Sequence, residues 1–174
     1  MLIAPSALLP TYRRAFRSLP LLAGLALVPA LAQAEPDGGF APVWPTHGVI
    51  TTYFGERSPL LSRGHPGIDI AAPKGTPVAA ADDGEVLKAS WSGDGYGSLI
   101  IIAHPSGFET WYAHLSQIGV EPGAGVHKGD QIGLMGSTGF STGSHLHFEV
   151  HEDGQLCDPL AFLSETQLAT GETW

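Results

Sequence analysis

Two histidines flank a single leucine in the stretch GSHLHFEV, residues 143–150. If this stretch is a β-strand, side chains two apart point to the same face, so His145, His147 and Glu149 share one side. The opposite side, which would face the core, carries Leu146, Phe148 and Val150. The two imidazoles would lie about 7 Å apart at the backbone, close enough for one to bind a metal ion and the other to reach a molecule bound to it. An H-x-H pair alone also fits a polar outer face, so this interpretation requires further ligands.

A histidine and an aspartate stand four residues apart in RGHPGIDIA, residues 63–71. On a helix His65 and Asp69 would share a face, but Pro66 and Gly67 disfavour a helix there. On a straight strand the two would lie about 13 Å apart, too far to bind one ion. A turn at Pro66-Gly67 would bring the imidazole back beside the carboxylate at the start of a strand. The alternative is a turn histidine and a strand-edge aspartate with no common role.

A further histidine lies in the aromatic stretch FETWYAHLS, residues 108–116. In a strand, alternation puts Thr110, Tyr112 and His114 on one face. The other face then carries Trp111, Ala113 and Leu115. His114 can be merely solvated there, and Tyr112 can either line a substrate groove or pack against a neighbouring strand. This histidine has a catalytic meaning only if the other candidates lie beside it.

Together these stretches supply the residue types of a catalytic zinc site, namely His65, Asp69, His114, His145 and His147. Such a site holds zinc with three nitrogen or oxygen ligands and leaves one position open. Two neutral imidazoles and one carboxylate keep the ion a Lewis acid, which lowers the pKa of bound water towards about 7. Histidines that do not bind the ion can move protons and stabilise an oxyanion. Spacing alone does not say whether His145 or His147 is a ligand.

Short apolar runs separated by glycine-rich turns predict the elements that position these residues. The predicted strands are 48–54, 67–71, 76–81, 84–90, 98–104, 108–115, 131–136 and 145–151. The first helical stripe of useful length is at 160–169. We therefore expect an all-β fold, a mostly antiparallel sheet or sandwich of short strands with little helix.

The first residues have the pattern of a secretory signal peptide. Three arginines precede an apolar run at 19–34, which ends in the small-x-small sequence Ala32-Gln33-Ala34. The arginines are Arg13, Arg14 and Arg17. An uncleaved anchor is the alternative, and the arginine pair also fits twin-arginine export. The predicted organisation is a signal peptide at 1–34, a linker at 35–43, one domain at 44–163 and a C-terminal tail at 164–174.

The chain of 174 residues has a net charge of −9. Without residues 1–34 it keeps five of its eight basic residues and all 17 acidic ones, so the net charge becomes −12. Such a protein lacks the basic surface that nucleic-acid binding requires, and no stretch predicts stable membrane insertion. Cys157 is the only cysteine, which excludes an internal disulfide and suggests a small buried side chain. We expect a monomer without nucleic-acid partners.

The order and spacing of these motifs resemble the lysostaphin-type, or LytM-type, zinc metallopeptidases, which cut peptide bonds in bacterial peptidoglycan. The resemblance covers residues 44–163 and rests on HPGIDIAAPKGTPVAAADDGEV, YGSLIIIAH, TWYAHLS, VHKGDQIGLMGSTGFSTGSHLHFEV and CDPLAFL. It implies a fold like the duplicated hybrid motif and one zinc ion per chain. It also implies that His65, Asp69 and His147 bind zinc and that His114 and His145 are the catalytic histidines.

The remaining polar candidates have simpler interpretations. Glu149 either orients a ligand histidine or is a solvated carboxylate, and His104 belongs to a turn. Three further histidines are assigned to the surface: His47, His127 and His151. The loop before His65 is shorter than is common in the family, which leaves the choice of substrate bond open.

The resemblance predicts an exported zinc endopeptidase, in the periplasm or at the cell envelope, that acts on peptidoglycan stem peptides or cross-bridges. A first alternative is a non-catalytic activator of other wall hydrolases, since some members of the family have lost metal ligands. A second is a biotinyl- or lipoyl-type carrier domain, which would need a lysine on an exposed hairpin tip. None of the lysines near these hairpin-like segments sits in that context, and export to the envelope fits a carrier poorly; they are Lys74, Lys88 and Lys128.

Overall fold

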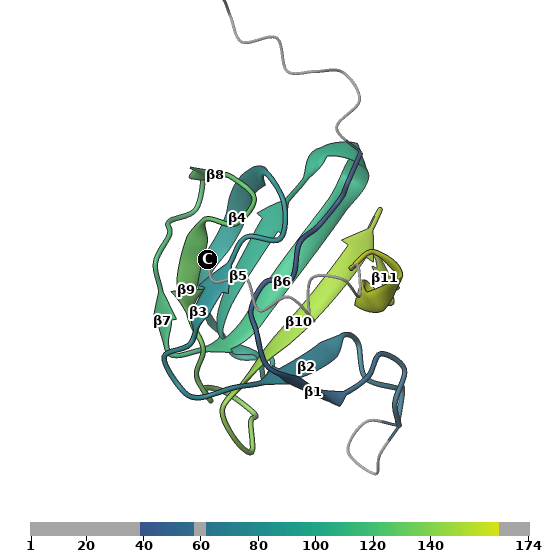
Figure 1. Ribbon diagram of the computed structural model, residues 1–174, viewed down its shortest axis with the longest axis vertical. Coiled ribbons are helices and arrows are strands. Elements are labelled where there is room, and N and C mark those ends of the chain that lie inside the picture. The colour runs from purple at the N-terminus through teal and green to yellow at the C-terminus, as the bar shows by residue number, and fades with distance from the viewer. Residues whose placement is uncertain (1–38, 58–61, 164–174) are drawn as a thin grey trace, which may run out of the picture. The chain divides into compact units, whose positions relative to one another are not determined.

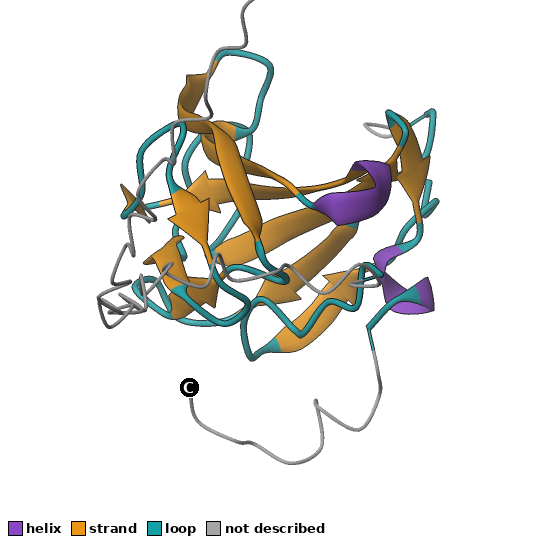
Figure 2. Ribbon diagram, turned by 90° about the horizontal axis from the view of Figure 1, so that it is seen from above, coloured by secondary structure: helices purple, strands orange, loops and turns teal. Residues whose placement is uncertain are grey.

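The computed structural model of the chain describes residues 39–57 and 62–163, and Figure 1 shows their arrangement. The predicted signal peptide, the first part of the predicted linker and the predicted C-terminal tail lie outside these residues. The strands are β1 (Val49–Thr52), β2 (Ile68–Ala71), β3 (Pro77–Ala79), β4 (Gly84–Ser92), β5 (Gly97–Ala103), β6 (Phe108–Leu115), β7 (Gln117–Ile118), β8 (Gly125–Val126), β9 (Gln131–Leu134), β10 (His145–Glu152) and β11 (Gln155–Cys157). The described helical segments are the 3₁₀ turns η1 (Pro105–Gly107) and η2 (Pro159–Ala161) (Figure 2).

The strands form two antiparallel sheets. The larger sheet has the order β1-β2-β10-β6-β5-β4-β8, with β11 paired to β10, and the smaller has the order β3-β9-β7. This confirms the all-β, mostly antiparallel fold class. Each of the eight strands expected from the sequence is present, whereas β7, β8 and β11 are too short to show a period. The expected helical stripe at 160–169 is represented in the described residues only by η2.

The hydrophobic core lies between one face of the larger sheet and the smaller sheet. It joins Ile100, Tyr112 and Phe148 of the larger sheet to Val78 and Ile132 of the smaller one. The three residues of β10 expected to face the core are fully buried: Leu146, Phe148 and Val150. Burial of this apolar face fixes the register of β10, because a slip by one residue would turn its histidines into the core. None of the described helical segments is long and apolar enough to cross a membrane.

The opposite face of the larger sheet carries the polar candidates. A small apolar cluster of Leu99, Ile101 and Ala113, with Tyr96 and Trp111 packed against it, covers part of this face. Strand β10 lies between β2 and β6, where His147 pairs with Asp69 on one side and with Ala113 on the other. The antiparallel register therefore brings segments far apart in the sequence to one point.

Strand β6 contains an irregularity that changes the direction of His114. Tyr112 pairs with Ile100 and Leu115 pairs with Ser98, so three steps along β6 match two steps along β5. His114 has a φ of 60°, in the left-handed region that side chains other than glycine rarely adopt. Because of this bulge, the predicted common face of Tyr112 and His114 is wrong. Tyr112 is fully buried in the core, while the His114 ring contacts the histidines of β10.

Candidate metal and catalytic site

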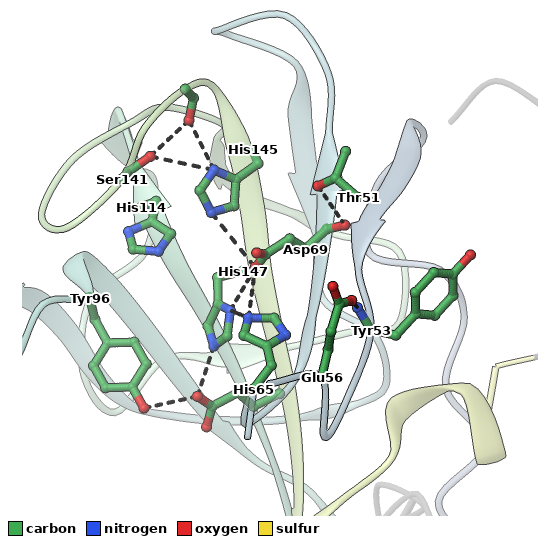
Figure 3. Close-up of polar contacts among 12 residues, drawn as sticks. Thr51, Tyr53, Glu56, His65, Asp69, Tyr96, His114, Ser141, His145 and His147 are labelled. Atoms are coloured by element: carbon green, nitrogen blue, oxygen red, sulfur yellow. Dashed lines mark hydrogen bonds and ion pairs between the residues drawn. The ribbon is translucent and has the colours of Figure 1, made fainter. Parts of the chain in front are cut away.

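Three side chains converge on one point above the paired strands β2 and β10 (Figure 3). Asp69 Oδ1 lies 2.8 Å from His147 Nδ1 and 3.2 Å from His65 Nε2. The two imidazole nitrogens are 3.1 Å apart. Both histidines are buried, and Asp69 is mostly so. The structure thus brings together the three residues that the sequence predicts as metal ligands.

Local backbone structure explains how His65 reaches Asp69. The chain bends at Pro66-Gly67, as the sequence predicts, and His65 is fixed by backbone hydrogen bonds to Gly55 and Glu56. A Cβ on Gly67 would overlap the carbonyl oxygen of Phe148, so glycine allows the bend to pack directly against β10. The turn and the neighbouring strand therefore form one unit.

The donor set fits a small divalent cation that prefers nitrogen and oxygen ligands. In a tetrahedral zinc site with bonds of about 2.0–2.1 Å, ligand atoms lie about 3.3 Å from one another. The three separations here, 2.8, 3.1 and 3.2 Å, are close to that value. Two imidazoles and one carboxylate also match the ligand types of catalytic zinc sites. The three residues can hold such an ion and leave a coordination position free.

The charges of this cluster are strongly coupled. Burial alone would raise the pKa of Asp69, but hydrogen bonds from His147 and His65 and their charges hold it far below its ordinary value. Burial alone would lower the pKa of His147, whereas hydrogen bonds to Asp69 and Glu149 and their charges outweigh it and raise that pKa to about 9. The cluster is therefore built around an ionised carboxylate that favours positive charge beside it.

Two further histidines lie beside the three ligands. His145 Nε2 is 3.7 Å from Asp69 Oδ1, and the ring centroids of His114 and His145 are 4.7 Å apart. His145 Nδ1 donates to the carbonyl oxygen of Gly143 at 2.9 Å, and His114 Nδ1 donates to that of Thr138 at 2.8 Å. Because a carbonyl only accepts, both imidazoles carry their proton on Nδ1 when neutral. Each keeps the Nε2 lone pair for another partner.

His114 is held in its neutral form. Burial lowers the pKa of His114 to about 4, although the hydrogen bond to Thr138 raises it, while His145 and His147 beside it lower it further. At neutral pH this imidazole has an unprotonated Nε2 that can accept a proton. Two backbone features allow the position of His114. One is its positive φ, and the other is the lack of a side chain on Gly136, where a Cβ would lie 2.8 Å from the His114 carbonyl oxygen.

Behind His147 lies a carboxylate whose role the sequence left open. Glu149 is fully buried, so the interpretation as a solvated carboxylate is wrong. Its Oε1 accepts hydrogen bonds from His147 Nε2 at 2.9 Å and from the Tyr96 hydroxyl at 2.8 Å, and its Oε2 accepts from His151 Nε2 at 2.7 Å. Burial alone would raise the pKa of Glu149, but these hydrogen bonds, first that from His147, lower it to about 2.

Two hydrogen-bond partners of Glu149 are not predicted from the sequence. His151 was expected at the surface, yet it is mostly buried, binds Glu149 and stacks on Trp111. The alternation of β10 placed His151 on the same face as His147, a signal that was available. Nothing in the sequence indicated Tyr96, which comes from the turn between β4 and β5.

The other histidines have structural or solvent-exposed positions. His47 and His127 are exposed, as expected. His104 follows β5 at the turn, but it is buried and hydrogen-bonded to the carbonyl oxygen of Asp83 and to Thr110. Cys157 is a free, half-buried cysteine, less enclosed than expected. The carrier alternative gains no support from Lys128, because its ammonium binds Asp82 and the carbonyl oxygen of Ala41.

Comparison with known families adds an independent finding. The model of Peptidase family M23 matches residues 63–159, which contain all five predicted site residues. Among curated proteins, the DD-carboxypeptidase/endopeptidase Mpg of Neisseria meningitidis serogroup B is 45% identical over 130 residues, 73% of this chain and 30% of Mpg.

The chain is also similar to a protein described as an activator and to a peptidase of known structure. The murein hydrolase activator NlpD of Escherichia coli is 39% identical over 122 residues, 70% of this chain and 31% of NlpD. A solved zinc-containing peptidase from Vibrio cholerae superposes with a TM-score of 0.61 and 37% identity, over 67% of this chain and 37% of that one. The chain thus spans about a third of the length of these relatives.

Proposed function

Because the chain belongs to peptidase family M23, we propose that it is an exported, zinc-dependent endopeptidase that hydrolyses peptide cross-links in peptidoglycan. The family assignment agrees with the resemblance to lysostaphin-type peptidases noted in the motifs. The observation that carries the proposal is the convergence of His65, Asp69 and His147 on one point beside two further histidines. A site that only needed a polar surface would not bury three such groups together.

In the proposed site, His65 Nε2, Asp69 Oδ1 and His147 Nδ1 hold one zinc ion. A zinc ion held in this way supplies a Lewis acid for the scissile carbonyl and lowers the pKa of water bound to it. The chain must therefore provide only proton transfer and orientation. Zinc is supported by the donor types, by their separations and by the zinc-containing relative of known structure.

His145 and His114 are the proposed catalytic residues. Their Nδ1–H groups are tied to backbone carbonyls, so their Nε2 atoms can accept a proton from the attacking water. Once protonated, the same Nε2–H can stabilise an oxyanion or return the proton to the leaving amine. The buried, neutral state of His114 keeps one base available at neutral pH. Both roles use only groups within the cluster described above.

The relatives support the substrate class of this proposal. Mpg is described as a DD-carboxypeptidase/endopeptidase, which favours a peptide bond in the stem peptides or cross-bridges of peptidoglycan. We propose that the protein acts on this substrate as a monomer, in the periplasm or elsewhere in the cell envelope. We propose that residues 1–34 direct export and that residues 44–163 form the catalytic domain.

Digestion of purified sacculi tests the proposal. The protein without residues 1–34, loaded with Zn²⁺, is incubated with sacculi, and the released products are identified by mass spectrometry. The proposed activity predicts new free amino and carboxyl termini at one type of cross-link. A sample treated with chelator is expected to release none, and activity should return when Zn²⁺ is restored. Full release by the metal-free protein would contradict the proposal.

The similarity to NlpD supports one alternative, a non-catalytic activator of other wall hydrolases. Such a protein would release no peptides by itself but would increase the release by an added murein hydrolase. The presence of all three candidate ligands and both histidines favours the enzyme. Assays of this protein alone and of its His145→Ala variant separate the two, because an activator would work equally well in both forms.

A further inference from the structure

Glu149 is a fully buried carboxylate on the face of β10 that carries the metal ligands. It accepts three hydrogen bonds, from His147, His151 and Tyr96, and so has donors for both oxygens. Burying a carboxylate is costly unless hydrogen bonds and nearby positive charge compensate it. The donors here are two imidazoles and a phenol, none of which carries a permanent charge.

The donors to Glu149 are themselves held by aromatic contacts. The His151 ring stacks on Trp111 with centroids 4.7 Å apart and an interplanar angle of 18°. Tyr96 packs edge-on against the same indole at 5.6 Å. On the side of Glu149 that faces Gly67, a Cβ on this glycine would lie 2.9 Å from Glu149 Cγ. The glycine in the turn after His65 therefore leaves room for the Glu149 side chain. Glu149 is therefore confined from both sides.

The hydrogen bond to Glu149 determines which ring nitrogen of His147 keeps its proton when an ion is bound. A carboxylate only accepts, so His147 Nε2 must be the N–H. Nδ1, which lies 2.8 Å from Asp69 Oδ1 and 3.1 Å from His65 Nε2, is then the ring nitrogen that binds the ion once its own proton is displaced. The other ligand histidine differs, because Nδ1 of His65 is buried and has no hydrogen-bond partner among residues 39–57 and 62–163.

We propose that Glu149 is a positioning residue of the metal site, which holds the ring of His147 in the orientation and tautomer that bind the ion. The carboxylates of Glu149 and Asp69 would together also balance the two positive charges of a divalent cation in this buried site. His151 and Tyr96 act through Glu149 by fixing its two oxygens. This inference rests on the metal site of the proposed function and concerns how tightly that site binds.

The test measures Zn²⁺ affinity by competition with a chromophoric chelator, in wild type and in Glu149→Gln. The variant keeps the shape of the side chain but removes its charge, and the dissociation constant is expected to rise about 10- to 100-fold. A matched control is Glu152→Gln, at an exposed position on the same strand, which should bind as wild type does. The Nε2–H resonance of His147 in the zinc-loaded protein gives a second readout. In Glu149→Gln it is expected to shift and to exchange faster with water.

Different failures can be told apart. A wild type that binds no Zn²⁺ overturns both the proposed function and this inference. A wild type that binds Zn²⁺, with a folded Glu149→Gln that binds within threefold of it and keeps the resonance unchanged, overturns this inference alone. If Glu149→Gln does not fold, the Tyr96→Phe, His151→Phe double variant decides. It keeps the aromatic contacts and should bind at least about threefold more weakly, and unchanged affinity would refute the role of Glu149.

Discussion

His104 and His147 are both buried histidines in hydrogen-bonded networks; His104 directly follows β5, and His147 lies on β10 of the same sheet. In the His104 network each donor meets a single acceptor, whereas at His147 three possible metal-ligand atoms converge. The difference lies in the number of ligand atoms that face one point. It separates a histidine that stabilises the fold from a histidine that binds a ligand.

The network of His104 runs in one direction. His104 Nδ1 donates to the carbonyl oxygen of Asp83 at 2.8 Å, so Nε2 accepts from the Thr110 hydroxyl at 2.6 Å. The Tyr112 hydroxyl lies 2.8 Å from that of Thr110 and accepts from the backbone N–H of Ala81. Every donor has one acceptor, and no further ligand is required.

At His147 three possible metal-ligand atoms face one point. They are Nδ1 of His147, Nε2 of His65 and Oδ1 of Asp69. Such a cluster is stable when protons or a cation occupy that point. The comparison teaches that convergence of ligand atoms, and not burial alone, distinguishes a candidate metal site.

The largest effect is expected when each of the two buried histidines is replaced. His147→Ala removes one of three ligands, so the variant should retain no stoichiometric Zn²⁺ and should show no measurable hydrolysis of sacculi. His104→Gln replaces an equally buried histidine and should keep one Zn²⁺ per chain. Metal analysis after dialysis, with assays of released peptides, measures both. One tightly bound Zn²⁺ in His147→Ala would show that the ligand set is wrong.

A second prediction separates metal binding from proton transfer within the site. His145→Gln should keep its Zn²⁺, because His145 is not among the three converging ligands, but should lower the hydrolysis rate about 10²- to 10⁴-fold. Single-turnover assays at saturating enzyme measure the rate. Ser141→Ala is the control, since the Ser141 hydroxyl lies 3.4 Å from His145 Nδ1 and lends it only a weak contact. A His145→Gln rate near that of wild type would exclude a catalytic role.

Strand periodicity predicted much of this site from the sequence. The face shared by His145, His147 and Glu149 follows from alternation, and the bend at Pro66-Gly67 follows from residues that cannot continue a helix or a straight strand. The assignment of metal to His147 and not to His145 came from the family resemblance, because alternation treats the two alike. The structure distinguishes them, since Nδ1 of His147 faces Asp69 at 2.8 Å.

Other features depend on contacts that no local pattern encodes. The bulge in β6 that turns His114 away from Tyr112 depends on the register with β5. The alternation of residues within β6 alone does not contain that register. The pattern of β10 leaves Glu149 open because its environment comes from elsewhere: Trp111 is its partner on β6, and Tyr96 binds it from the turn between β4 and β5. Tertiary packing thus decided the roles that the sequence left open.

A smaller effect is expected when the complete network is broken. Thr110→Val keeps the shape of a fully buried side chain but leaves His104 Nε2 without its donor. The free energy of unfolding should fall by about 1–3 kcal/mol, and Zn²⁺ affinity should not change. Thr51→Val makes the same chemical change at an exposed position and should alter stability by less than about 0.5 kcal/mol. Urea unfolding measures both, and an unchanged Thr110→Val would show that the network adds no stability.

The smallest predicted effect is the pH dependence that His104 gives to stability. Burial lowers the pKa of His104 from 6.5, although the Asp83 carbonyl and the charges of Asp82 and Asp83 raise it, while Lys128 lowers it. The unfolded chain therefore binds more protons below pH 6.5, and stability is present above that pH and falls as the pH decreases towards the folded-state pKa. For one proton the slope is at most about 1.4 kcal/mol per pH unit.

His104→Gln isolates this contribution, because glutamine can donate to Asp83 and accept from Thr110 without titrating. Urea unfolding of the metal-free proteins at pH 7.5, 6.5 and 5.5 should show wild type losing stability more steeply than the variant. Asp69 and Glu149 keep low pKa values in both proteins, so their protonation does not contribute to the difference in this range. Parallel pH profiles would mean that the pKa of His104 is the same in the folded protein as in the unfolded chain. His104 would then become charged within the folded protein over this pH range, and the one-way network inferred for it would be wrong, since a charged imidazole could not accept from Thr110.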